Sequence, residues 1–137
     1  MSDMDEWNRK NIEEFRANGG VVGGDLAGMP ILLLHHTGAK SGTERVNPLV
    51  YQQVGDAVAV FASKGGAPTN PDWFHNLVAH PTVSIEIGTE SYPVTARVAD
   101  GEERERIWEA QKAAIPVFAQ YELMTRRVIP VLLLERA

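Results

Sequence analysis

Short glycine turns between stretches of alternating apolar and polar residues restrict the fold of this chain more than any other feature of its sequence. Gly55-Asp56 joins the stretch from Arg45 to Val54 to the stretch from Ala57 to Ser63. Gly88-Thr89 joins two further stretches in which every second residue is apolar. Two-residue glycine turns between such stretches are typical of β-hairpins, whose strands are antiparallel. The sequence therefore predicts a sheet built mainly from hairpins.

Two more apolar stretches, Ile31 to His36 and Ile129 to Leu134, predict additional strands, giving about six in total. Helical patterns cover residues 4–18, 73–79, 101–114 and 117–126, with Asp72 as the expected N-cap of the second helix. Strands and helices do not alternate regularly, which argues against a Rossmann layout. We expect an α+β, mainly β fold, an antiparallel split β-barrel with peripheral helices, forming one domain over residues 1–137.

The composition narrows the classes of protein to consider. The 137 residues include no cysteine, which excludes disulfides, thiolate catalysis and cysteine zinc sites. The formal net charge of −5 argues against a nucleic-acid binder. His35 and His36 are neighbours on a strand and point to opposite faces, so we expect no metal site.

The ends and apolar stretches of the chain bear on its location. The acidic N-terminus does not resemble a signal peptide, and no apolar stretch is long enough to span a bilayer. These features predict a cytoplasmic protein without a transmembrane segment. Peripheral contact with a membrane through Trp7 and Phe15 of the N-terminal helix is the alternative.

Two short basic turns carry the strongest indication of function. The first places Lys40, Ser41 and Arg45 beside Gly42, and the second is Ser63-Lys64-Gly65-Gly66. Cations, a hydroxyl and backbone N–H groups that glycine leaves accessible can together hold a phosphate. The first turn lacks the preceding glycine that a Walker loop requires. We expect one anionic small molecule to bind between the turns, and a solvated hairpin loop is the alternative.

Aromatic residues follow the second turn and recur late in the chain. Trp73 comes shortly after the second basic turn, and Phe118 and Tyr121 lie three residues apart on a short helix, so they share a face. These residues predict an aromatic wall over a ligand pocket, with the Tyr121 hydroxyl as a hydrogen-bond donor. Packing of the same residues into the core is the alternative.

Four short motifs follow one another in a characteristic order. They are Lys40-Ser41-Gly42 with Arg45, Asn47-Pro48-Leu49, Ala62-Ser63-Lys64-Gly65-Gly66-Ala67, and Asn70-Pro71 with Trp73 and Asn76. In this order they resemble the deazaflavin-dependent nitroreductase family, and the similarity extends over nearly the whole chain. The resemblance implies a split β-barrel like that of flavin-binding oxidoreductases. It also implies coenzyme F420, a deazaflavin with a phosphodiester and an oligoglutamate tail.

The resemblance assigns roles by position. Lys40, Ser41 and Arg45 would hold the phosphate and the tail, with Lys64 supporting them from the second turn. The full cofactor set that it implies is Ala39, Lys40, Ser41, Gly42, Arg45, Asn47, Pro48, Leu49, Val50, Ala62, Ser63, Lys64, Gly65, Trp73 and Asn76. The hydroxyls of Ser63 and Tyr121 would polarise the acceptor, in a substrate pocket formed by Val50, Ile115, Phe118 and Tyr121.

The implied activity is hydride transfer from reduced F420 to an electron-poor acceptor, such as a quinone, an activated enone or lactone, or a nitroaromatic compound. The expected partners are therefore the coenzyme and a planar, hydrophobic substrate. A protein that binds F420 without turnover, and an FMN-dependent oxidoreductase on the same barrel, are the alternatives. No feature of the sequence indicates the oligomeric state.

Overall fold

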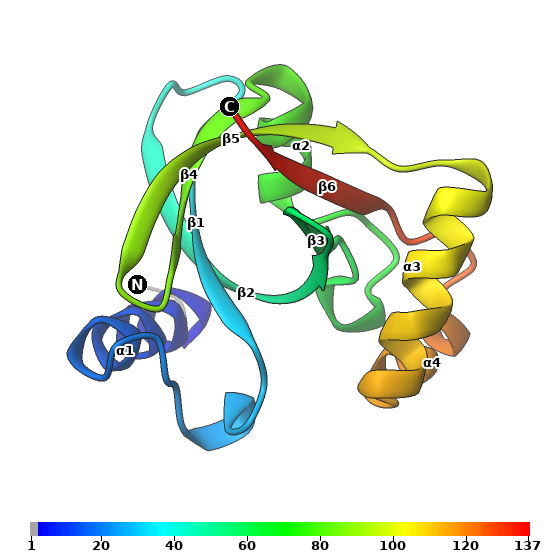
Figure 1. Cartoon of the computed structure of the whole chain (residues 1–137), viewed down its shortest axis with the longest axis horizontal. Helices are drawn as coiled ribbons and strands as arrows, with labels where there is room; N and C mark the ends of the chain where they lie inside the picture. Colours follow the sequence, from blue (N-terminus) through cyan, green and yellow to red (C-terminus); the bar gives the residue numbers. More distant parts are fainter. Residues whose placement is uncertain (1–2) are drawn as a thin grey trace.

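A closed barrel of six antiparallel strands forms the centre of the computed structural model, which describes residues 3–137 (Figure 1). The strands are β1 (Ile31–Thr37), β2 (Glu44–Val54), β3 (Ala57–Phe61), β4 (Thr82–Ile87), β5 (Glu90–Val98) and β6 (Val131–Arg136). They follow one another around the barrel in the order β1-β2-β3-β6-β5-β4, and β4 pairs with β1 to close it. The barrel confirms the antiparallel fold predicted from the hairpin turns.

Successive side chains along each strand point to opposite faces of the sheet, so every second side chain points into the barrel. Apolar side chains at these positions fill its interior. In the β4–β5 hairpin, Ile85 lies directly opposite Tyr92. Ile85, Val94, Leu32 and Leu34 are all fully buried in one core cluster. The period-two pattern of the sequence therefore points its apolar side into the barrel.

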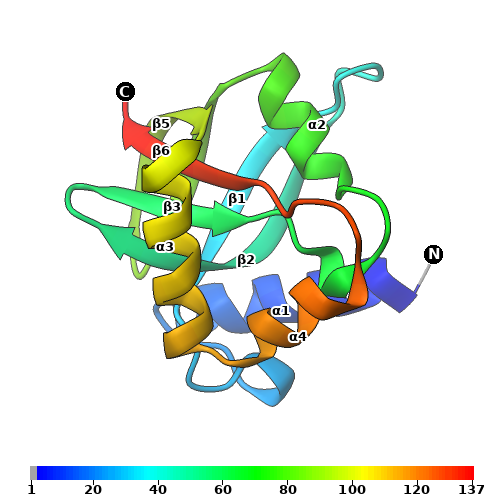
Figure 2. The same cartoon turned by 90° about the vertical axis from the view of Figure 1, so that its right-hand side faces the viewer.

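Four helices lie outside the barrel: α1 (Asp3–Ala17), α2 (Asp72–Ala79), α3 (Gly101–Ala114) and α4 (Val117–Met124). Helices α3 and α4 lie next to each other on one side, as Figure 2 shows from the front, whereas α1 lies elsewhere, against β2. A second core fills the space under α3 and α4. Within it, the ring centroid of Trp108 lies 5.9 Å from that of Phe61 and 6.3 Å from that of Phe118.

Helix α1 packs on the barrel through Phe15. This side chain is only 1% exposed and lies among Val22, Ile31 and Leu33. The backbone N–H of Gly20 donates to the carbonyl oxygen of Phe15, which ends the helix at the predicted glycines. Because Phe15 is buried, the alternative of a membrane contact through this residue is wrong. Among the described residues, no helix is both long and apolar enough to cross a membrane.

Several element boundaries differ from those predicted, and β3, for example, ends at Phe61 rather than Ser63. The last strand begins at Val131 rather than Ile129, because Pro130 has no N–H to donate to a strand; its carbonyl instead accepts a hydrogen bond from Ala62. Helix α4 ends at Met124, two residues early. Asp72 lies inside the first turn of α2 and makes no capping hydrogen bond, since Pro71 occupies the N-cap position.

Candidate active site

Two neighbouring depressions contain most of the predicted site residues. The first, here called the turn pocket, has a volume of about 580 Å³ and is lined by Gly38, Ala39, Lys40, Ser41, Arg45, Asp72, His75 and Asn76. The second, here called the aromatic pocket, has a volume of about 390 Å³; its lining includes Asn47, Pro48, Leu49, Val50, Phe61, Ser63, Lys64, Gly65, Trp73, Phe118 and Tyr121. Arg45 and Asp72 line both pockets, so the two depressions meet at this pair.

The first basic turn is held in a defined shape by its own backbone. Gly38 donates to the carbonyl of Thr43 and accepts from the N–H of Gly42, which has a φ of 69°. A Cβ atom on Gly38 would lie 2.3 Å from Oγ of Ser41, so only glycine fits there without movement of Ser41. Helix α2 fixes the turn from outside, because Oδ1 of Asn76 accepts a hydrogen bond of 2.9 Å from the N–H of Ala39.

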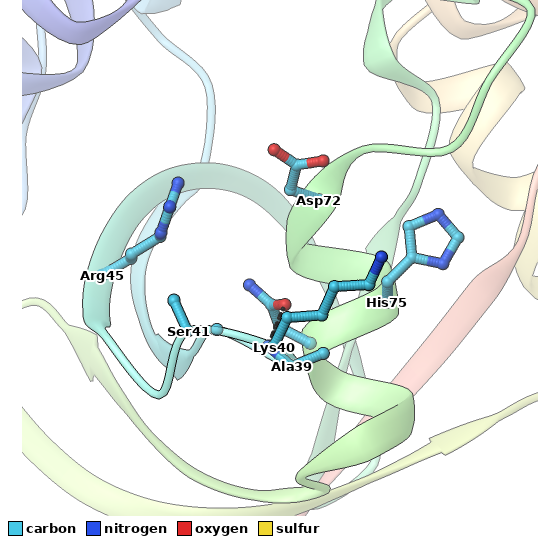
Figure 3. A pocket seen from close by; sticks show the side chains of 8 residues that line it. Ala39, Lys40, Ser41, Arg45, Asp72 and His75 are labelled. Carbon is cyan, nitrogen blue, oxygen red and sulfur yellow. Dashed lines mark hydrogen bonds between the residues drawn. The ribbon is translucent and has the colours of Figure 1, made fainter.

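The cations of this turn are available to a ligand. In Figure 3, Lys40 extends toward His75 of α2, and Arg45 extends from β2 on the other side of the turn. Within the part of the chain whose side chains are described, neither Lys40 nor Arg45 has an ion-pair partner. Two such cations beside an exposed Ser41 hydroxyl favour an anion, and phosphate fits both charge and hydrogen bonding.

The second basic turn presents unpaired backbone N–H groups. Ser63 has right-handed helical angles (φ −75°, ψ −37°), whereas Lys64 and Gly65 are left-handed, with φ of 48° and 62°. Successive N–H groups in such a turn converge into a concavity that attracts anions. Among the described residues, the N–H groups of Ser63, Lys64 and Gly65 have no acceptor. Lys64 is also the only described non-glycine residue with a positive φ, a strain that is often found at functional sites.

Arg127 holds this second turn in place from the segment before β6. Its guanidinium donates to the carbonyls of Ala62, Ser63 and Ala67 and to Oδ1 of Asn70, at 2.7 to 3.1 Å. Burial lowers the pKa of Arg127 from its usual value. The four hydrogen bonds fix the loop that carries Ser63 and Lys64 into the aromatic pocket.

The aromatic pocket combines apolar walls with two hydroxyl groups. Phe118 and Tyr121 of α4 meet edge to face, with ring centroids 5.3 Å apart. Ser63 and Tyr121 both line the pocket. Such an apolar cavity with a few polar groups is typical of a site for a planar small molecule.

A family model for F420H(2)-dependent quinone reductases matches residues 7–136. The chain belongs to this family. One relative, the F420H(2)-dependent quinone reductase Rv1261c of Mycobacterium tuberculosis, is 38% identical over 126 residues, which cover 89% of this chain and 85% of that protein. The match confirms the resemblance inferred from the basic turns, and the description of the family names quinones as its acceptors.

Solved structures agree with this membership. The F420-H2 dependent reductase FDR-A is 45% identical, with a TM-score of 0.71, over 77% of this chain and 94% of that one. A structure described as a domain-swapped dimer is 40% identical, with a TM-score of 0.73, over 97% of this chain and 100% of that one. The split-barrel architecture is therefore shared with F420-dependent members of the family.

The site of this F420H(2)-dependent quinone reductase family member fits an anionic, planar cofactor. Lys40 and Arg45 lack partners among the described side chains, and the N–H groups of the second turn lack acceptors. These cations and N–H donors would both bind an anion or a carbonyl oxygen. Among the described residues, no group of three His, Asp or Glu side chains could hold a metal ion.

Not every residue implied by the resemblance lines these pockets. Gly42 shapes the first turn without lining either pocket, and Ala62 is fully buried in the core. Ile115 lies apart, because α3 ends there and the residue lines a different depression next to Gln52 and Pro116. The expected placement of Ile115 at the substrate pocket does not agree with this arrangement.

Trp73 has both of the roles considered for it. It lines the aromatic pocket, yet it is only 6% exposed and belongs to the barrel core, so it offers a ligand little surface. The amide of Asn76 is similarly engaged, because it bonds to Ala39 and His36. Sequence reasoning missed several lining residues: Trp7, Asn8, Leu26, His36, Phe61, Pro71 and Asp72.

Proposed function

We propose that this chain uses reduced F420 to reduce a quinone-type acceptor, with the coenzyme spanning the two pockets. The observation that carries the proposal is that the turn pocket, whose two cations have no ion-pair partner among the described side chains, meets the aromatic pocket at Arg45 and Asp72. Lys40, Ser41 and Arg45 would hold the phosphate and the tail. The deazaflavin would lie in the aromatic pocket beside Asn47, Leu49 and the second basic turn.

Reduced F420, when bound, supplies a hydride to an electron-poor acceptor. The chain's own residues would bind the coenzyme, orient the acceptor beside it and polarise the acceptor oxygen. The hydroxyls of Ser63 and Tyr121 would donate hydrogen bonds to the acceptor oxygen, where negative charge develops. The N–H groups of the second turn, which have no acceptor among the described residues, would stabilise negative charge on the cofactor ring or the acceptor. Phe118 and Val50 would keep water away and favour a planar, hydrophobic acceptor.

A parallel titration with reduced F420 and with FMN tests the choice of cofactor. We expect F420 to bind more tightly, because the cations of the turn pocket suit its longer anionic tail. A steady-state assay with a soluble quinone such as menadione then tests turnover. Tighter binding of FMN would overturn the cofactor assignment, and F420 binding without oxidation by any quinone, enone or nitroaromatic would indicate a coenzyme carrier.

The Tyr121→Phe variant tests the role of the hydroxyl. We expect kcat with menadione to fall about tenfold or more while the Kd for F420 stays unchanged, because the hydroxyl would act on the acceptor only. Tyr51→Phe is the matched control, since Tyr51 lines the separate depression that contains Ile115. Equal kcat values for the two variants would exclude Tyr121 from the reaction.

A further inference from the structure

A continuous chain of hydrogen bonds connects the first basic turn to the aromatic pocket through a buried histidine. The N–H of Ala39 donates to Oδ1 of Asn76 at 2.9 Å. Nδ2 of Asn76 lies 2.9 Å from Nδ1 of His36, and Nε2 of His36 lies 2.6 Å from Oδ1 of Asn47. His36 is only 2% exposed, and the sequence pattern gave it no role.

The backbone N–H of Ala39 fixes the direction of every hydrogen bond in this chain. A backbone N–H is always a donor, so Oδ1 of Asn76 must face it, and Nδ2 of Asn76 must donate to His36. Nδ1 of His36 is then an unprotonated acceptor, and the ring proton sits on Nε2. That proton is donated to Oδ1 of Asn47, which leaves Nδ2 of Asn47 as a donor with no acceptor among the described residues.

The surroundings of His36 favour this neutral form. Burial is the main cause that lowers its pKa from the usual 6.5, and the positive charges of Arg45 and His35 lower it further. The hydrogen bond to Asn47 and the negative charge of Asp72 act in the opposite direction. A proton on Nδ1 would point at the Asn76 amide hydrogens, so protonation would break the link to Ala39.

We propose that His36 is a positioning residue that holds two parts of the coenzyme site in register. Through Asn76 it fixes the turn that carries Lys40, and through Asn47 it presents an amide N–H to the aromatic pocket. This inference rests on the proposed function, since it takes the two pockets to hold the two parts of one coenzyme. A carbonyl of the deazaflavin ring is the chemical group that the amide N–H of Asn47 fits.

Two substitutions separate the two links. His36→Asn keeps an acceptor near the position of Nδ1 and so preserves the link to Asn76, but it loses the donor to Asn47. His36→Gln keeps a donor near the position of Nε2 and so preserves the link to Asn47, but it loses the acceptor for Asn76. His36→Leu, of similar size, removes both links.

The affinities for two ligands report separately on the hydrogen bonds from His36 to Asn76 and to Asn47. The probes are F420 and its fragment without phosphate and tail, which contains only the ring and its sugar-alcohol chain. We expect His36→Gln to weaken F420 binding about tenfold and to leave fragment binding unchanged within about twofold. We expect His36→Asn to weaken both by about the same factor, roughly tenfold, because the ring loses its oriented donor.

The pH dependence provides a further readout. The affinity of the wild-type protein for F420 is expected to fall as the pH is lowered below the usual histidine pKa of 6.5 and His36 gains a proton. In both amide variants this part of the pH dependence is expected to disappear. His35, Asp72 and His75 remain in all three proteins, so the comparison isolates the contribution of His36.

Nitrogen NMR of His36 in the ligand-free wild-type protein tests the direction of the hydrogen bonds around His36 without any variant. A neutral ring protonated on Nε2 at neutral pH is expected; a proton on Nδ1 would overturn the proposal. Equal effects of His36→Asn and His36→Gln on both ligands would overturn it as well. If the wild-type protein binds neither F420 nor the fragment, the proposed function fails and the positioning role with it, while the NMR result still reports the direction of the hydrogen bonds.

Discussion

Arg127 donates a hydrogen bond of 2.7 Å to Oδ1 of Asn70, which lies 57 residues earlier in the chain. The guanidinium also donates to the carbonyls of Ala62, Ser63 and Ala67, at both ends of the second basic turn. One side chain therefore ties the loop that carries Ser63 and Lys64 to the segment leading into β6.

The Arg127→Ala variant is expected to lower the free energy of unfolding by about 3 kcal/mol, because several partly buried carbonyls lose their donors at once. Urea unfolding measures the change. Arg126→Ala is the matched control, since Arg126 is exposed and its removal changes the net charge equally. Arg127→Lys is expected to recover little, because lysine lacks the planar fork of donors. A loss below about 1 kcal/mol for Arg127→Ala would contradict the role of this residue as a clamp.

Removal of both cations of the turn pocket is expected to weaken coenzyme binding without unfolding the protein. The Lys40→Ala/Arg45→Ala variant should bind F420 about a hundredfold more weakly, since each charge-assisted contact contributes about a factor of ten. Its Tm should stay close to that of the wild-type protein. Lys10→Ala/Arg106→Ala removes the same charges from exposed helix positions that line neither pocket. Equal affinities of the two double variants would exclude the turn pocket as the anion site.

The contact between Glu86 and Arg16 is expected to make the attachment of α1 dependent on pH. The hydrogen bond from Arg16 is the main cause that lowers the pKa of Glu86 below its usual 4.5, and the bond to His35 adds to it, whereas burial opposes both. A carboxylate whose pKa is lower in the folded state stabilises the fold above its unfolded pKa and loses this effect as the pH falls through the folded value.

Glu86→Gln is therefore expected to cost roughly 1 kcal/mol of unfolding free energy at pH 7, a modest amount because Arg16 is half exposed. The difference from the wild-type protein should shrink toward pH 3. Urea unfolding over this pH range measures it, and Glu13→Gln, in an exposed pair with Arg9, should have a smaller effect at every pH. A difference that grows toward acid pH would contradict the assigned sign.

Gly66 is expected to be intolerant of any side chain. Its φ is 83°, and a Cβ there would lie 2.8 Å from Cβ of Met124 and 3.1 Å from the carbonyl oxygen of Tyr121. Gly66→Ala should lower the free energy of unfolding by about 3 kcal/mol, from left-handed strain and overpacking combined. Gly65→Ala is the control, since Gly65 has a φ of 62° but nothing within 4 Å of its added Cβ. Equal thermal stability of the two variants would mean that α4 does not rest on Gly66.

The sequence predicted the strands well because their signals are local. Alternating residues such as Ile85 and Val94 and the turn at Gly88-Thr89 act over a few positions, and tertiary packing did not override them. The placement of β6 between β3 and β5 has no such local signal. It depends on which strand edges remain unpaired after the hairpins have formed.

Local sequence signals also decided how much of the site could be predicted. The basic turns could be predicted because lysine, serine and glycine occur together within a few residues. His36 was overlooked because its partners, Asn47 and Asn76, lie 11 and 40 residues away, and no spacing rule links them. Asp72 was assigned to capping, but Pro71 takes that position and leaves its carboxylate beside the pockets.

The position of β6 has a consequence for synthesis on the ribosome. Because β6 fills the gap between β3 and β5, both strands keep an unpaired edge until residues 131–136 have left the exit tunnel. Unpaired edges of a nascent sheet are prone to pair with other chains. A ribosome-bound chain that lacks residues 131–136 would therefore have no closed barrel, and it would need protection from aggregation until translation reaches the last strand.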